Sequence, residues 1–245
     1  MKVLAINGSP RGKTSCTSKM LTPILAGMQE EGAETECINL VEHSVHHCLG
    51  CLCCWTKTPG KCVIADDMAA FLDKIIAADI LILGTPLYIF SMTGLMKNFI
   101  DRLLPLAEPW LLQDEKNPNR TVHPLRSPKK MKVFLVSPAG FPEFCHFDAL
   151  VTTFKQFTDT MGIEYLGEIL RPGAEVLRVE NIFVRFILRS YFANLKKVGR
   201  ELVLHGKVSE ELQLALKKDL LPGGPAMYRK VGNRYFKKQL AKLNK

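Results

Sequence analysis

The chain has 245 residues, of which 47% are hydrophobic and 23% charged, a composition typical of a folded globular protein. No run of about 18 uncharged apolar residues occurs, so we expect no membrane-spanning helix. The first six residues lead into Asn7-Gly8-Ser9-Pro10 rather than into a long apolar region, so we expect no secretory signal and a cytoplasmic location.

Positive charge is concentrated at one end of the chain, whose formal net charge is +9. Residues 1–170 contain 16 Lys and Arg against 18 Asp and Glu, whereas residues 171–245 contain 17 against 6. This asymmetry indicates a basic element attached to a nearly neutral fold. We therefore expect a main domain at 1–170 and a basic helical C-terminal extension at 171–245.

Short apolar runs alternate with helical patterns from the N-terminus onward. We expect a strand at residues 2–6 and a helix at 14–31, followed by a second strand at 36–40. A loop at 46–64 separates this strand from a helix that begins near Asp66. The run at 79–83 is the clearest buried strand, because four apolar residues are closed by Gly84-Thr85-Pro86.

The same alternation continues through the second half of the main domain. A helix is expected at 94–104, a strand at 131–136, a helix at 147–161 and a strand near Tyr165. Residues 105–130 contain five prolines and predict a long irregular insertion. The pattern predicts an α/β fold with a doubly wound, parallel, five-stranded sheet covered by helices on both faces.

Three turns are expected to converge where the strands of such a sheet end, at residues 7–15, 84–92 and 137–142, because ligands bind beyond the carboxyl ends of parallel strands. The first turn, Gly8 to Ser15, is rich in glycine and hydroxyl groups and precedes a helix, as in sites for a phosphate monoester. It is not a nucleotide P-loop, because only three residues separate Gly8 from Gly12 where that motif needs four.

Three motifs together resemble the NADPH-dependent FMN reductase and iron–sulfur flavoprotein family, whose members are flavodoxin-like. They are Gly8-Ser9-Pro10-Arg11, Thr85-Pro86-Leu87-Tyr88 and Lys97-Asn98-Phe99-Ile100-Asp101-Arg102. The resemblance covers roughly residues 1–170 and implies a flavodoxin-like fold that binds FMN. It implies a phosphate site at Ser9, Arg11, Lys13, Thr14 and Ser15, a wall along the flavin ring at Pro86, Leu87, Tyr88, Ile89 and Phe90, and closure around the other ring edge by Ala139 and Gly140.

Five of the eight cysteines fall within residues 48–62, which indicates a metal or redox site rather than a disulfide scaffold in a chain without a secretory signal. The pattern Cys48-x2-Cys51-x2-Cys54-x7-Cys62 has the compact spacing of a 4Fe-4S site. The family resemblance implies the same, since iron–sulfur flavoproteins have a comparable motif after the second strand. Cys53 competes with Cys54 for the third ligand position.

Two other interpretations of these thiols remain open. A zinc site with four cysteine ligands fits less well, because the single C-x2-C pair overlaps a third cysteine and Cys62 has no such partner. His46 and His47 precede the motif, but adjacent histidines are more often surface residues. The thiols are metal-free in the third interpretation.

The basic extension is expected to begin with a helix at 181–204. Arg185, Arg189, Lys196 and Arg200 lie at or near helical spacing among large apolar residues. We favour a subunit interface of a homo-oligomer for this helix over contact with a membrane surface. The tail at 229–238 is basic with interleaved aromatics, but no nucleic-acid-binding module is recognised.

The leading hypothesis is an FMN-dependent electron-transfer oxidoreductase. Ferredoxin or NAD(P)H would supply electrons through a 4Fe-4S cluster and FMN to a small-molecule or protein acceptor. The basic surface would attract an acidic donor such as ferredoxin. One alternative is an NAD(P)H-dependent quinone or flavin reductase without a cluster, and another is a non-catalytic thiol or metal redox sensor.

Overall fold

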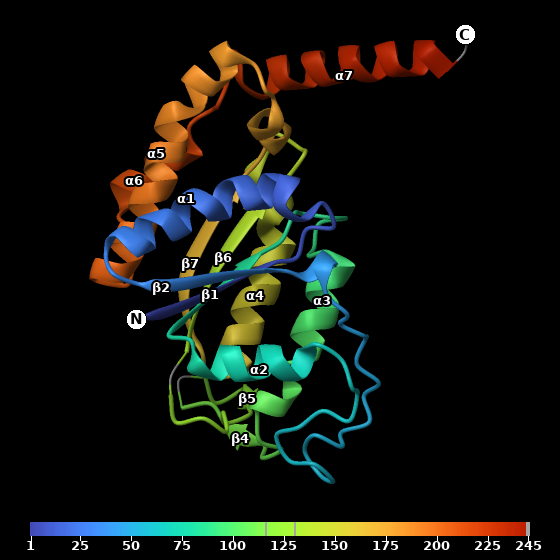
Figure 1. The fold of residues 1–245 in the computed structure, drawn as a ribbon, viewed down its shortest axis with the longest axis vertical. Coiled ribbons are helices and arrows are strands. Elements are labelled where there is room, and N and C mark those ends of the chain that lie inside the picture. The colour runs from blue at the N-terminus through green and yellow to red at the C-terminus, as the bar shows by residue number, and fades with distance from the viewer. Residues whose placement is uncertain (116, 130, 244–245) are drawn as a thin grey trace.

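Five parallel strands form the central sheet of the protein (Figure 1). A computed structural model describes residues 1–115, 117–129 and 131–243. The strands lie in the order β2-β1-β3-β6-β7, and every neighbouring pair is parallel. This order confirms the predicted flavodoxin-like, doubly wound sheet. The strand bounds are β1 (Lys2–Asn7), β2 (Glu34–Asn39), β3 (Ile80–Gly84), β6 (Lys132–Pro138) and β7 (Glu164–Arg171).

The three central strands end at one edge of the sheet. Asn7 at the end of β1 pairs with Gly84 at the end of β3, and Gly84 pairs in turn with Val136 of β6. The backbone N–H of Gly8 donates to the carbonyl of Gly84 at 2.7 Å, which continues the ladder one residue beyond β1. The turns that follow these strands therefore leave the sheet side by side.

Helices cover both faces of the sheet. Within β1, Val3 and Ala5 contribute to one core, and Leu4 and Ile6 contribute to the other. Apolar residues on both faces are expected for a parallel sheet that is buried on both sides. One face carries α1 (Cys16–Glu30), α5 (Ile182–His205) and α6 (Glu210–Lys217), and the other carries α2 (Met68–Ala77), α3 (Gly94–Asp101) and α4 (Asp148–Thr160).

Two predicted helix boundaries were wrong by a few residues. α1 begins at Cys16 rather than at Thr14, because Gly12–Thr14 forms a separate 3-10 turn. α3 ends at Asp101 rather than at Leu104. The N–H groups of Arg102 and Leu103 donate to carbonyls three residues earlier, which tightens the last turn before a short 3-10 helix at Leu104–Leu106.

The insertion expected at 105–130 is more ordered than its sequence predicts. It contains an antiparallel pair of two-residue strands, β4 (Leu112–Gln113) and β5 (Thr121–Val122). The ring of His123 lies 4.8 Å from the ring of Trp55, and the Trp55 indole N–H donates to the carbonyl of Leu104 at 3.1 Å. The insertion therefore packs against the cysteine loop.

Two glycines let α1 and α5 cross at very short range. A Cβ atom at Gly27 would lie 1.9 Å from the backbone oxygen of Lys196, and one at Gly199 would lie 1.9 Å from that of Ile24. Both contacts are with backbone atoms of the facing helix, which a rotamer change cannot relieve. Glu30 on α1 forms ion pairs with Lys196 and Arg200 beside the crossing. The crossing thus makes α5 part of one face of the fold.

The chain ends in α7 (Gly224–Leu243), which projects from the body of the protein (Figure 1). None of its residues is buried. Across the described ranges, no helix combines the length and hydropathy needed to cross a membrane.

Candidate functional site

The first turn presents the N-terminus of α1 at the carboxyl edge of the sheet. Ser15 caps the helix, since its Oγ accepts from the N–H of Ser18 at 3.0 Å and donates to the carbonyl of Gly12 at 2.7 Å. No acidic residue occurs in the first turn of α1. The positive end of the helix dipole is therefore available to an anion.

Asn7, which was not among the predicted site residues, holds this turn in shape. Its buried Nδ2 donates to the carbonyl of Gly12 at 3.1 Å and to Asn39 Oδ1 at 2.9 Å. Its Oδ1 accepts from the N–H of Ser9 at 3.0 Å. A polar residue at the end of an apolar strand is the only signal in the sequence that points to this role.

The remaining predicted phosphate contacts lie at different depths. Ser9 is buried, and its Oγ accepts from the N–H of Arg11 at 3.3 Å. Arg11 and Lys13 lie at the rim, where they form exposed ion pairs with Glu175 at 3.1 Å and Glu42 at 3.5 Å. An incoming phosphate would compete with those two carboxylates for the cations. Thr14 is exposed, and its hydroxyl donates to the carbonyl of Arg11 at 3.0 Å.

The second turn contains two residues in an unfavourable backbone conformation. Tyr88 and Ser91 exchange backbone hydrogen bonds at 2.9 and 3.0 Å, and between them Ile89 and Phe90 have φ angles of 44° and 63°. A β-branched residue at positive φ is strained, and Ile89 is also 92% exposed. Strain of this kind, about 1–3 kcal/mol per residue, is concentrated at ligand sites.

Thr93 joins the first turn to the second. Its hydroxyl donates to the carbonyl of Gly8 at 2.6 Å and accepts from the N–H of Met96 at 3.2 Å, so it also caps α3. Its own N–H donates to Thr85 Oγ1 at 3.1 Å. These buried bonds fix the spacing between the predicted phosphate turn and the predicted ring wall.

An aromatic cluster joins the second turn to the third. The rings of Phe90 and Phe141 are stacked, with centroids 6.4 Å apart and planes 11° apart. His146 lies 5.7 Å from Phe90 and 4.7 Å from Phe141, ring to ring. Phe141 lies within the predicted third turn but, like His146, was not among the predicted site residues. The three turns predicted to converge are thus brought together.

The other predicted residues of the second and third turns take different positions. Leu87 donates its N–H to the carbonyl of Pro138 at 2.9 Å, which ties the two turns together beside Pro86. Tyr88 and Phe90 are about half exposed, at 46% and 47%. Ala139 is buried and Gly140 is exposed. The half-exposed aromatic side chains and the open backbone at Gly140 leave a surface against which a planar ring can lie.

The four cysteines predicted as metal ligands line a single hollow. Cys48, Cys51, Cys54 and Cys62 surround it together with Arg102, and Cys54 is buried. Positive φ angles at Gly50, Leu52 and Gly60 turn the loop around this space. Cys53 is not among the described residues that line the hollow. Its exclusion favours Cys54 as the third thiol of the set.

Among the described residues, the four cysteine side chains do not form a complete metal coordination sphere. Within residues 1–115, 117–129 and 131–243, no group of three or more Cys, His, Asp or Glu side chains has the arrangement of a metal site. The residue types nevertheless suit an iron–sulfur cluster, because four cysteines line one hollow and a buried cation is present to balance negative charge.

The cysteines differ in the pKa of their thiols. Hydrogen bonds from the backbone N–H and the thiol of Cys53 lower the pKa of Cys51. Burial raises the pKa of Cys16 to about 11, and its Sγ donates to the carbonyl of Ala174. The thiolate is the nucleophile, so its fraction near neutral pH is larger at Cys51 than at Cys16.

We therefore expect iodoacetamide at pH 7.5 to alkylate Cys51 well before Cys16 in metal-free, reduced protein. Peptide mass mapping over a time course measures both rates, and urea-unfolded protein is the control in which the two rates should become similar. Equal rates in the folded protein would contradict the described environments of the two thiols.

Comparison with known proteins is consistent with this geometry. The family model described as NADPH-dependent FMN reductase matches residues 1–117. The matched residues are just under half of the chain and are similar to that family. An iron–sulfur flavoprotein of Methanocaldococcus jannaschii is 41% identical over 115 residues, which are 47% of this chain and 58% of that protein. One of Archaeoglobus fulgidus is 39% identical over 105 residues, which are 43% of this chain and 46% of that protein.

The chain thus spans about half the length of these curated relatives. Among solved structures, the NAD(P)H:quinone oxidoreductase of Methanothermobacter marburgensis has a TM-score of 0.60 at 15% identity, covering 82% of this chain and 98% of that one. An FMN-dependent NADH-azoreductase of Bacillus anthracis, solved in complex with FMN, has a TM-score of 0.59 at 16% identity, covering 83% and 100%. At these identities the structural matches establish a shared fold.

Proposed function

We propose that this protein is an FMN-dependent oxidoreductase that passes electrons from ferredoxin or NAD(P)H, through a 4Fe-4S cluster and FMN, to a small-molecule or protein acceptor. The observation that carries the FMN assignment is the convergence of three turns at the N-terminus of α1, the first two of which lie in the segment that matches the FMN reductase family. Bound FMN supplies one- and two-electron redox chemistry.

In this proposal the first turn binds the FMN phosphate. The α1 N-terminus and the hydroxyl of Ser9 provide neutral donors, and Arg11 and Lys13 provide charge from the rim. Phosphate binding would draw Arg11 away from Glu175 and Lys13 away from Glu42. The contacts of Ser15 with Gly12 and Ser18 keep the helix end in place without requiring Ser15 itself to move.

The second and third turns would flank the isoalloxazine ring. The bonded pair Tyr88 and Ser91 sets the backbone between them, while Phe90 and Phe141 offer apolar faces. Ala139 and Gly140 would close the other edge. An apolar, partly aromatic slot with few polar groups is typical of a flavin site.

Phosphate recognition gives a direct test of this site. A hydrogen bond to a charged group is worth about 1.5–3 kcal/mol, so loss of the phosphate contacts should weaken binding by about 10- to 150-fold. We expect the flavin-free protein to bind FMN more tightly than riboflavin by this factor, as measured by quenching of flavin fluorescence. Arg11→Gln should weaken FMN binding and leave riboflavin binding unchanged; equal affinities in the unmodified protein would contradict the phosphate site.

The four thiols that face one hollow support the cluster part of the proposal. Protein isolated without oxygen should show a broad absorbance near 400 nm beyond the flavin bands, together with iron and acid-labile sulfide. A yellow protein without iron would instead support a quinone or flavin reductase that uses no cluster. A colourless protein that does not quench flavin fluorescence would refute both and leave the redox-sensor hypothesis.

The donor and the assembly state are also proposed here. Excess basic charge in residues 171–245 is complementary to an acidic ferredoxin. Stopped-flow reduction by ferredoxin should therefore slow steeply with added salt, and reduction by NADPH should slow less.

We propose a homo-oligomer, because Ile182, Phe183 and Phe186 at the start of α5 are all more than 70% exposed.

A further inference from the structure

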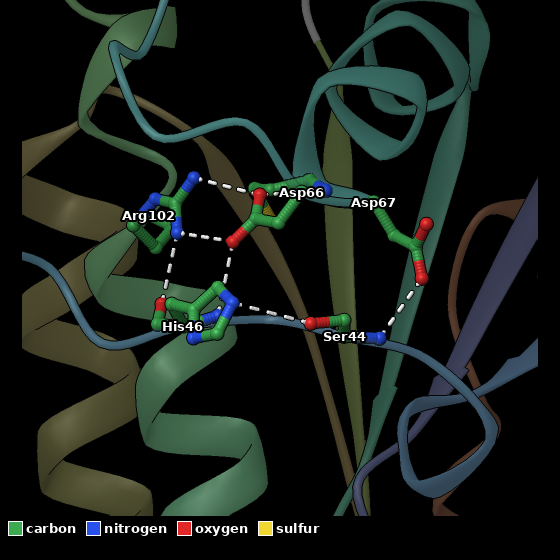
Figure 2. Close-up of polar contacts among 6 residues, drawn as sticks. Ser44, His46, Asp66, Asp67 and Arg102 are labelled. Atoms are coloured by element: carbon green, nitrogen blue, oxygen red, sulfur yellow. Dashed lines mark hydrogen bonds and ion pairs between the residues drawn. The ribbon is translucent and has the colours of Figure 1, made fainter.

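Arg102 is a buried cation directly after α3, and its side chain is 1% exposed. Its two terminal nitrogens donate to both carboxylate oxygens of Asp66, at 2.7 and 2.9 Å (Figure 2). Nη1 also donates to the carbonyl of His46 at 2.9 Å. Such a two-pronged pair fixes the plane of the guanidinium group.

Asp66 is held as firmly as its partner. Its Oδ2 accepts from the N–H of His46 at 2.9 Å, and its Oδ1 accepts from the N–H of Met68 at 3.1 Å. The neighbouring Asp67 accepts from the N–H of Ser44 at 2.9 Å (Figure 2). These bonds tie both ends of the cysteine loop to one another, with Arg102 between them and α3.

One donor of this buried network is left without a partner. Nε of Arg102 is inaccessible to solvent and makes no hydrogen bond to any described residue. Arg102 also lines the hollow that Cys48, Cys51, Cys54 and Cys62 surround. A buried N–H without an acceptor is costly, so its position beside four sulfur atoms calls for a ligand that accepts hydrogen bonds.

The charges around Arg102 are consistent with its position beside the four thiols. Burial acts to lower the pKa of Arg102, but its hydrogen bonds to Asp66 and the negative charge of a nearby Cys62 thiolate raise the pKa overall. The guanidinium therefore stays charged. Asp66 balances that charge. The one carboxylate among the described residues that line the hollow is Asp101, which forms an ion pair with Lys97.

We propose that Arg102 is a positioning residue for the cluster, in which its Nε–H and its charge stabilise the ligand sulfur of Cys62. This inference rests on the proposed iron–sulfur function. Four thiolates and their cluster carry net negative charge, which a fixed cation offsets. Hydrogen bonds to cluster sulfurs and local charge also set the reduction potential, and a cation favours the reduced, more negative state.

A simpler role for Arg102 would be purely structural: its hydrogen bonds would hold the cysteine loop against α3 (loop stapling). That role needs the bonds to Asp66 and His46 but no contact with the thiols. It predicts that a substitution preserving those bonds leaves the cluster unchanged. The midpoint potential of the cluster therefore separates the two roles, because loop stapling alone does not move it.

The test uses two variants of the full chain. Asp66→Asn with Arg102→Met replaces the ion pair by neutral side chains, and removes both the charge and Nε–H without leaving an unpaired charge in the interior. Arg102→Lys keeps a cation beside Asp66 but loses the planar fork. Glu30→Gln with Arg200→Gln is the matched control, since it removes an exposed Arg–Glu pair on the opposite face of the sheet.

Each protein is reconstituted anaerobically with FMN, iron and sulfide, and three quantities are measured: flavin content, the rate of iron loss to a chelator, and the cluster midpoint potential by redox titration. We expect full flavin content throughout. Iron loss should be about tenfold faster or more in the double variant, as for other residues that support metal ligands. Its midpoint potential should be more negative than that of the unmodified protein, with the Lys variant between the two and the control unchanged.

Unchanged iron loss and potential in both variants would overturn the role of Arg102 while leaving the cluster itself established. Failure of the unmodified protein to assemble a cluster would overturn the proposed cluster function and this inference with it. Should the double variant lose its flavin through misfolding, the Lys variant decides, because it keeps the charge on which Asp66 depends.

Discussion

Replacing Cys54 with serine is expected to remove most of the iron and acid-labile sulfide from protein isolated without oxygen, while the flavin remains bound. Cys54 is buried and lines the hollow with Cys48, Cys51 and Cys62. A serine hydroxyl is a harder, weaker ligand for iron–sulfur chemistry than a thiolate. The proposed flavin contacts lie on other loops, so flavin binding should be retained.

Cys53→Ser is the matched control, because Cys53 adjoins Cys54 in the chain but is absent from the described lining of the hollow. It should retain iron and sulfide at the level of the unmodified protein. The measurement is iron, sulfide and flavin per chain, together with the absorbance near 400 nm. If Cys53→Ser lost the iron and Cys54→Ser kept it, the ligand assignment would be reversed.

Gly199→Ala is expected to destabilise the fold by at least about 3 kcal/mol, at the upper end of the usual cost of overpacking. The added methyl would lie 1.9 Å from the backbone oxygen of Ile24 and 2.8 Å from the backbone nitrogen of Met28. Alanine gains about 1 kcal/mol in helix propensity over glycine, which the clash exceeds. Since backbone atoms of α1 cannot move aside locally, α5 must shift as a whole.

Thermal and urea unfolding measure this effect, and we expect the midpoint temperature to fall by about 6–12 °C for a chain of this size. Gly232→Ala in α7 is the control, because a Cβ there meets nothing within 4 Å. It should leave the stability unchanged or slightly higher. A Gly199→Ala variant as stable as the unmodified protein would mean that the helices do not cross as closely as described.

The fold was largely predictable because its strands are continuous apolar runs closed by strong breakers. The run before Gly84-Thr85-Pro86 became β3, shifted by one residue from the expected strand. The boundaries that were wrong depend on hydrogen bonds that periodicity does not reveal. Ser15, not the residue before Thr14, caps α1, and a tightened turn at Arg102 ends α3 early.

The location of the proposed flavin site was predictable from the sequence. The residues that form it were predicted less completely. Strand ends converge by topology, so the turns at 7–15, 84–92 and 137–142 were expected at one edge. Asn7 and Thr93 were not predicted, because an isolated Asn or Thr has no sequence signature for buried hydrogen bonds to distant segments. The assignment of individual residues to FMN remains a prediction.

Sequence by itself determined the α/β class, the parallel sheet and the candidate cysteine ligands, since these depend on local composition and spacing. Only the tertiary structure decided that Cys54 rather than Cys53 faces the common hollow, that Arg102 lies beside it, and that α5 crosses α1 at two glycines. The physical reason is that such features depend on the approach of segments far apart in the chain, whose side chains meet only after the sheet and its helices have packed.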